Sequence, residues 1–142
     1  MTIFRRLALL LAAFVRDERT GRSRDKKLKV LDIGTGSGII TLLLSKRFPE
    51  YEYQAVEIQE GLYEIAGENF ALHGLNVELH HASYMDLEGQ DRFDLIVSNP
   101  PFFKDSQVSK EESVAIARHE LHASMETLVE KSKKLLKGGG FL

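Results

Sequence analysis

The stretch Val30-Leu31-Asp32-Ile33-Gly34-Thr35-Gly36-Ser37-Gly38 decides the fold of this chain. Its apolar beginning, interrupted only by Asp32, is typical of a buried strand in a parallel sheet. The three glycines that follow let the backbone turn sharply and lie close to a ligand before a helix that runs to Pro49. This order of strand, turn and helix predicts an α/β fold with a ligand site at the carboxyl end of the strand.

The glycine spacing, G-x-G-x-G, differs from two phosphate-binding motifs. The dinucleotide fingerprint G-x-G-x-x-G has its third glycine where this chain has Ile39, and a Walker A loop has lysine where Gly38 stands. Asp32, two residues before Gly34, would repel a phosphate but attract a cation or hydroxyl groups. We therefore expect a ligand that is positively charged and has no phosphate. Its predicted contacts are Asp32, Gly34, Thr35, Gly36 and Gly38.

A carboxylate ends the second predicted strand, residues 52–57. The carboxyl ends of parallel strands meet at one edge of the sheet, so Glu57 is expected near the glycine turn. An acid in this place accepts hydrogen bonds from two ribose hydroxyls. The alternative for an isolated glutamate is a solvated surface charge, and the glycine turn upstream favours the ribose contact.

A third strand is predicted over residues 76–81, after an amphipathic helix that ends at Gly74. His80 and His81 are adjacent and point to opposite faces of a strand, so we predict no metal site. The next residues cross the same sheet edge, where Ser83 or Asp86 is expected to reach a bound adenine.

The fourth predicted strand, residues 93–97, leads into Ser98-Asn99-Pro100-Pro101-Phe102-Phe103. The prolines end the strand and fix the backbone before a substrate arrives. The carbonyl groups of the Asn99 side chain and the Pro100 backbone can each accept one hydrogen of a planar NH₂ group, which frees the nitrogen lone pair for reaction. Phe102 can lie flat on the substrate. The alternative is a plain strand-ending turn, which Asn-Pro alone would indicate. Asn-Pro-Pro-Phe directly after a buried strand is a more specific pattern and favours a substrate site.

Two segments precede the core. Residues 1–15 contain Arg5-Arg6 and nine apolar residues, a combination that a signal peptide also has. The charged run 16–19 follows at once without a convincing cleavage site, so we expect a helix that covers the sheet. Nine apolar residues are too few to cross a bilayer. Residues 16–29 hold seven basic residues and three acids, so they are either a solvated linker or a loop that contacts phosphates. We divide the chain into residues 1–27, an N-terminal helix and basic linker, and residues 28–142, the cofactor-binding core.

The C-terminal part is predicted as a polar loop, residues 104–112, and a long helix, residues 115–137. Gly138-Gly139-Gly140 is expected to end this helix, and Phe141-Leu142 to begin a fifth strand. Because a strand of two residues is too short, we expect that the C-terminal strands of the fold are missing.

The composition is that of a soluble globular protein, with 142 residues, 43% hydrophobic and 28% charged residues, and a net charge of −2. This length suffices for one domain with a core. The absence of cysteine excludes disulfides, thiolate catalysis and cysteine-bound zinc, and it fits a reducing compartment, so we expect a cytoplasmic protein without membrane contacts. The slight net acidity means that any contact with RNA must be local.

The glycine turn, Val56-Glu57 and Asn99-Pro100-Pro101-Phe102 together resemble class I S-adenosylmethionine-dependent methyltransferases that act on amino nitrogens. With Ala117-Arg118-His119-Glu120, the chain from about Leu28 onward is similar to the bacterial tRNA adenine-N6 methyltransferases. The resemblance implies a Rossmann-like, three-layer α/β sandwich with parallel strands in the order 3-2-1-4-5. It also implies S-adenosylmethionine as cofactor and methylation of the adenine next to the anticodon of a valine tRNA. That family has an acid where Ser83 stands, and Asp86 is the expected substitute.

Two alternatives stay open. Release-factor glutamine methyltransferases resemble this chain at Asn-Pro-Pro but usually continue with tyrosine, where this chain has Phe102. The second alternative is a truncated domain that binds the cofactor without catalysis.

Overall fold

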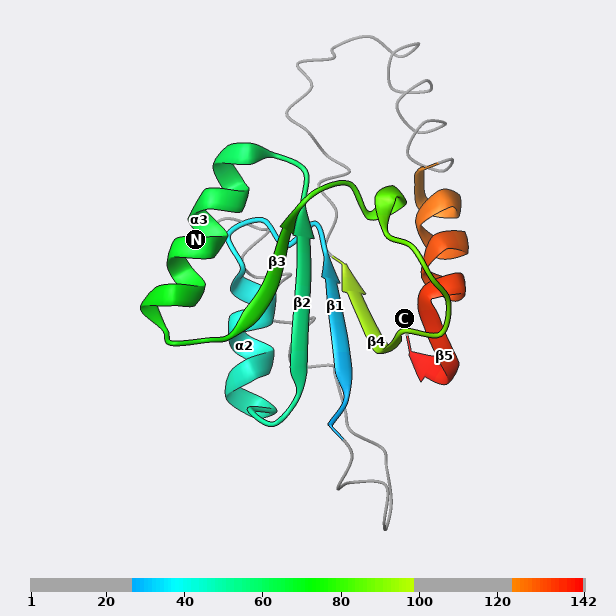
Figure 1. Cartoon of the computed structure of the whole chain (residues 1–142), viewed down its shortest axis with the longest axis horizontal. Helices are drawn as coiled ribbons and strands as arrows, with labels where there is room; N and C mark the ends of the chain where they lie inside the picture. Colours follow the sequence, from blue (N-terminus) through cyan, green and yellow to red (C-terminus); the bar gives the residue numbers. More distant parts are fainter. Residues whose placement is uncertain (1–26, 99–123, 142) are drawn as a thin grey trace, which may run out of the picture.

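The computed structural model describes residues 27–98 and 124–141. In this part of the chain, a five-stranded sheet has the order β3-β2-β1-β4-β5, and each neighbouring pair is parallel (Figure 1). The strands are β1 (Lys29–Ile33), β2 (Glu52–Glu57), β3 (Val77–His81), β4 (Phe93–Ser98) and β5 (Leu136–Phe141). The fold class and strand order predicted from the sequence are confirmed.

Helices cover both faces of the sheet. They are α2 (Ile39–Arg47), α3 (Glu60–Leu72) and a helix over residues 124–135, together with the short 3-10 helix η2 (Tyr84–Asp86). Both α2 and α3 pack on the face to which Tyr53 and Ala55 of β2 point, since these residues are two apart in the strand. On the other face, Leu128 of the C-terminal helix packs against Leu31 and Ile96. The described part therefore has the three layers that the sequence predicts.

The helix boundaries follow the expected signals. Gly38, with φ +88°, precedes α2, which ends before Pro49. Gly74, with φ +61°, follows α3 and lies in the left-handed region that ends many helices.

The fifth strand differs from the prediction. The C-terminal helix ends at residue 135, and β5 contains Gly138-Gly139-Gly140, so these glycines do not end the helix. Phe93 pairs with Leu136 and Leu95 pairs with Phe141, with a register shift between them. Pairing with β4 outweighs the low strand preference of glycine. Between the two pairs, β5 has more residues than β4, which is the pattern of a β-bulge.

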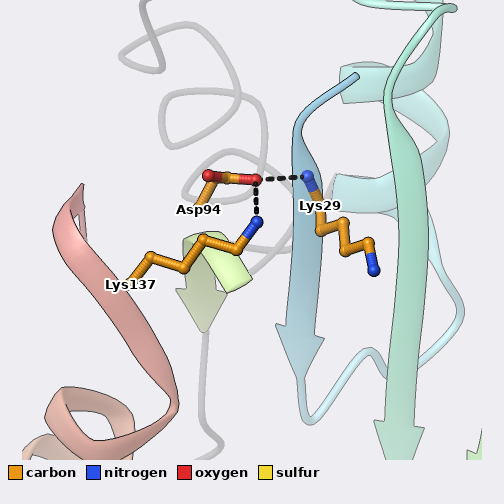
Figure 2. Close-up of polar contacts among 3 residues, drawn as sticks. All are labelled: Lys29, Asp94 and Lys137. Carbon is orange, nitrogen blue, oxygen red and sulfur yellow. Dashed lines mark hydrogen bonds and ion pairs between the residues drawn. The ribbon is translucent and has the colours of Figure 1, made fainter. Parts of the chain in front are cut away.

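Asp94 joins three strands at the amino edge of the sheet (Figure 2). Its Oδ2 accepts a hydrogen bond from the backbone N–H of Lys29 at 2.9 Å, and it lies 3.4 Å from the Nζ of Lys137. One carboxylate of β4 therefore connects this strand to both of its neighbours, β1 and β5, near their amino ends. The ion pair is partly exposed and contributes at most about 1 kcal/mol to folding.

Several predicted features lie outside the described residues: the helix 1–15, most of the basic segment 16–29, the stretch 99–102, the loop 104–112, the start of the helix 115–137 and the motif 117–120. The described end of the basic segment, Lys27 and Lys29, lies at the amino edge of the sheet. In residues 27–98 and 124–141, no helix has both the length and the apolar character needed to span a membrane.

Candidate functional site

The described residues that are predicted to bind a ligand lie at or just after the carboxyl ends of neighbouring strands, at the upper edge of the sheet in Figure 1. Ile33, the last residue of β1, is in register with Val56 of β2. The backbone N–H groups of Gly34 and Thr35 both donate hydrogen bonds to the Val56 carbonyl, at 2.9 and 3.1 Å. The glycine turn is therefore attached to the end of β2, beside Glu57.

Glu57 connects the glycine turn to the start of α3. Its carboxylate is buried, with Oε1 accepting a hydrogen bond from the N–H of Gly36 and Oε2 accepting one from the N–H of Gln59, both at 2.9 Å. Gln59 is the residue before the first turn of α3. Because a carboxylate oxygen has two acceptor positions, each oxygen can still accept a hydrogen bond from a ribose hydroxyl. Glu57 lies where the sequence predicts, and its ribose contact stays a prediction.

Asp32 is buried beneath the glycine turn, with 1% of its surface exposed. Its Oδ2 accepts hydrogen bonds from the hydroxyl groups of Thr35 and Thr41, each at 2.8 Å. Its Oδ1 is buried and has no hydrogen-bond partner among the described residues. Burial raises the pKa of Asp32 to about 6; the two threonine hydroxyls oppose this rise and the Glu57 charge adds to it.

We expect Asp32→Asn to increase the free energy of unfolding at pH 7. The folded carboxyl has a pKa of about 6 and the ordinary value is 3.8, so the folded state binds more protons between these values. Wild-type stability therefore falls as the pH rises through that window, by roughly 3 kcal/mol in total. Urea unfolding from pH 4 to pH 7 measures this loss, which Asp32→Asn removes and the exposed-site control Asp86→Asn keeps. Parallel pH profiles of wild type and Asp32→Asn would contradict the buried carboxyl as its cause.

The glycines of the turn serve two different purposes. Gly34 and Gly36 have φ of +68° and +59°, and a Cβ at either would meet no atom within 4 Å. The left-handed backbone requires glycine there, and the open space leaves room for a ligand. At Gly38, an added Cβ would lie 2.6 Å from Cε1 of Phe70. We expected the glycines to allow close approach to a ligand, whereas the close neighbour at Gly38 is a side chain of α3.

Ser83 and Asp86 follow β3 at the same edge. The N–H of Ala82 donates a hydrogen bond to the Glu57 carbonyl at 3.2 Å, which brings this segment beside the end of β2. The Ser83 hydroxyl oxygen accepts a hydrogen bond from the N–H of Met85 at 3.2 Å and caps η2, in which Asp86 is exposed. The adenine contacts of Ser83 and Asp86 stay predictions.

The two histidines of β3 have separate neighbours. Nε2 of His80 lies 3.2 Å from Oε1 of Glu78. The ring of His81 stacks on Tyr63, with centroids 5.1 Å apart, and its Nε2 lies 3.0 Å from the Ile58 carbonyl oxygen. Within the described ranges, no group of three or more His, Cys, Asp or Glu residues could hold a metal ion.

Three residues near the turn escape the sequence motifs. Thr41 on α2 and Asn69 and Phe70 on α3 contact Asp32, Ser37 and Gly38 respectively. A threonine and an asparagine on otherwise apolar helix faces were the only signals, and neither indicates a specific partner.

Comparison with known proteins identifies relatives of the chain. The tRNA1(Val) (adenine(37)-N6)-methyltransferase of Vibrio campbellii is 35% identical over 114 residues, which are 79% of this chain and 48% of that protein. The protein of the same name from Porphyromonas gingivalis is 40% identical over 119 residues, which are 79% of this chain and 47% of the relative. The chain thus spans about half the length of the curated relatives that it matches.

A solved structure has the same fold. PKMT2 from Rickettsia typhi in complex with AdoHcy matches with a TM-score of 0.59 and 27% identity, over 80% of this chain and 20% of that one. These likenesses confirm the resemblance found in the sequence and the Rossmann-like fold. The family model described as "Methyltransferase small domain" matches residues 8–142. Since that match covers nearly the whole sequence, the chain belongs to the methyltransferase small domain family.

Proposed function

We propose that this chain binds S-adenosylmethionine and transfers its methyl group to the exocyclic amino group of an adenine in tRNA. The proposal rests on the hydrogen bond that Glu57 Oε1 accepts from the backbone N–H of Gly36, at 2.9 Å, next to the buried Asp32. This combination offers acceptors for a ribose, an open turn and an anion in one place. The names of the relatives support the choice of a tRNA adenine as substrate.

The residues at this edge fit the cofactor. Gly34 and Gly36 leave open space at the turn, and the two oxygens of Glu57 suit two ribose hydroxyls. The ionised form of Asp32 lacks a cationic partner among the described residues, and a nearby positive charge would stabilise it. S-adenosylmethionine carries its transferable methyl group on a positively charged sulfonium, and it has no phosphate.

The proposed acceptor site begins where β4 ends. Ser98 is in register with Ile33, and its hydroxyl donates a hydrogen bond to the Ile33 carbonyl at 3.0 Å. The chain therefore leaves β4 directly beside the glycine turn, and Asn99 is the next residue.

We assign the chemistry to residues 99–102. The carbonyl groups of the Asn99 side chain and the Pro100 backbone each accept a hydrogen bond from one N–H of the adenine amino group. Pro101 fixes the backbone, and Phe102 stacks on the base. The nitrogen must come within about 3–3.5 Å of the methyl carbon, in line with the bond that breaks. The base must leave its stack to reach this position.

We expect Glu57→Gln to weaken binding of S-adenosylhomocysteine by about 1–3 kcal/mol, or roughly 5- to 150-fold. The amide keeps the size of the side chain, but an NH₂ group replaces one of the two carboxylate oxygens. This group cannot accept the hydrogen bond from whichever of Gly36 and Gln59 it faces, nor one from a ribose hydroxyl. Calorimetry measures the affinity, and Glu60→Gln, an exposed position in the first turn of α3, is the matched control. Unchanged affinity in Glu57→Gln, or equal affinity of the wild type for NAD, would reject this cofactor site.

The acceptor is tested with radiolabelled cofactor and either unmodified tRNA or release factor. We expect label in tRNA, in an adenine with a methylated amino group after nuclease digestion. The labelling should fall steeply with added salt, because phosphate contacts are screened. Label in the release factor would favour the glutamine alternative, and label in neither would contradict catalysis by this chain.

A further inference from the structure

We infer that Asn69 of α3 is a positioning residue that fixes the glycine turn for cofactor binding. The inference rests on the proposed cofactor site and adds to it a residue outside the sequence motifs. The Nδ2 group of Asn69 donates a hydrogen bond to the backbone carbonyl of Ser37 at 2.8 Å, across 32 residues of sequence.

This hydrogen bond acts on the middle of the turn. Ser37 lies between Gly36 and Gly38, and the backbone of glycine can adopt more conformations than that of any other residue. A carbonyl oxygen can only accept, so the amide nitrogen of Asn69 must face Ser37. The contact thus has one orientation and restrains the carbonyl of a residue that glycines flank on both sides.

Helix α3 holds the turn at two further points. Phe70, the next residue, occupies the space that a side chain at Gly38 would need. At the other end of the helix, Glu57 accepts hydrogen bonds from both Gly36 and Gln59. The turn is therefore held near both ends of α3, and Asn69 supplies the one side-chain hydrogen bond from within this helix to the turn that the described residues show.

Because this contact is exposed, its loss should affect cofactor affinity more than the stability of the fold. The hydrogen bond between Asn69 and Ser37 is accessible to solvent. When the donor is removed, water can hydrogen-bond to the Ser37 carbonyl, so the folded state loses little stability. Water does not restrain the turn, and the conformation competent to bind becomes one of several. We therefore expect a loss of affinity larger than the loss of stability.

Asn69→Asp tests the inference. Aspartate keeps the shape of asparagine, has no N–H to donate at neutral pH, and places an anion against the Ser37 carbonyl. Asn76→Asp is the matched control, because it makes the same charge change at an exposed position before β3. Calorimetry with S-adenosylhomocysteine should show affinity about three- to thirtyfold weaker for Asn69→Asp and within twofold of wild type for Asn76→Asp. Asn69→Ser, a second variant without the amide donor, should show a loss in the same direction if Asn69→Asp does not fold.

A second readout needs no ligand. Amide hydrogen exchange at Gly36 and Gly38 should be faster in Asn69→Asp than in Asn76→Asp, at closely similar melting temperatures. Equal exchange and equal affinity in the two variants would overturn the role of Asn69, as would an affinity loss that only follows a lower melting temperature. If wild type binds no S-adenosylhomocysteine, the proposed function fails, and the exchange rates alone still decide whether Asn69 holds the turn.

Discussion

Asn99→Ala is expected to lower the rate of methyl transfer by about 10²–10³-fold while cofactor affinity changes by no more than a few-fold. The adenine amino nitrogen is nearly planar before reaction and becomes tetrahedral as the methyl group arrives. The Asn99 carbonyl accepts an N–H that becomes more acidic during this change, so it stabilises the transition state more than the bound substrate. The loss of one oxyanion-hole donor in other enzymes sets the magnitude.

Single-turnover rates at saturating cofactor and tRNA measure the chemical step, and calorimetry measures the cofactor affinity separately. Asn76→Ala, at an exposed position, is the control and should keep both values. A variant Asn99→Ala that keeps its rate but loses the cofactor would assign this residue to cofactor binding instead.

Gly38→Ala is expected to lower the free energy of unfolding by about 2–6 kcal/mol. Two costs add: a non-glycine residue at φ +88° is strained by about 1–3 kcal/mol, and the new Cβ overlaps the Phe70 ring at 2.6 Å, which costs about 1–3 kcal/mol as an overpacked contact. Phe70 is buried between α3 and the sheet, so its ring has little room to move.

Urea unfolding monitored by circular dichroism measures the effect. The control is Gly61→Ala, in the first turn of α3, where a Cβ meets no atom within 4 Å and the helix preference of alanine should stabilise by about 0.5–1 kcal/mol. A second variant, Gly38→Ala with Phe70→Leu, should recover part of the loss. Equal stability of Gly38→Ala and wild type would contradict the close packing of α3 on the turn.

The sequence predicts the first four strands well because their signals are local. The run that ends at Ile33 is mostly apolar and leads into the glycine turn, and residues 52–57 contain Tyr53, Ala55 and Val56. Both become strands within one residue of the predicted bounds. The order of the strands follows from the resemblance to a known family. The fifth strand depends on pairing with β4, a long-range contact that local glycine preferences oppose, and this is why residues 138–140 were predicted as a helix end.

The residues of the candidate site also differ in whether local sequence signals predict them. Asp32, the turn glycines and Glu57 are visible in the sequence because each lies at a strand end, and the topology brings strand ends together. Asn69 and Phe70 reach the turn from the second half of α3, and their partners lie 32 residues away in the sequence. No periodicity distinguishes a helix residue that contacts a loop from one that packs on a sheet, so only the tertiary structure identifies them.

The two hydrogen bonds of Glu57 have a thermodynamic consequence for ligand binding. A free glutamate side chain samples many rotamers, and fixing them on association costs about 1 kcal/mol. Here the N–H groups of Gly36 and Gln59 already select one rotamer without a ligand. The loss of side-chain entropy therefore occurs during folding, and the carboxylate is preorganised for whatever hydroxyl groups it meets.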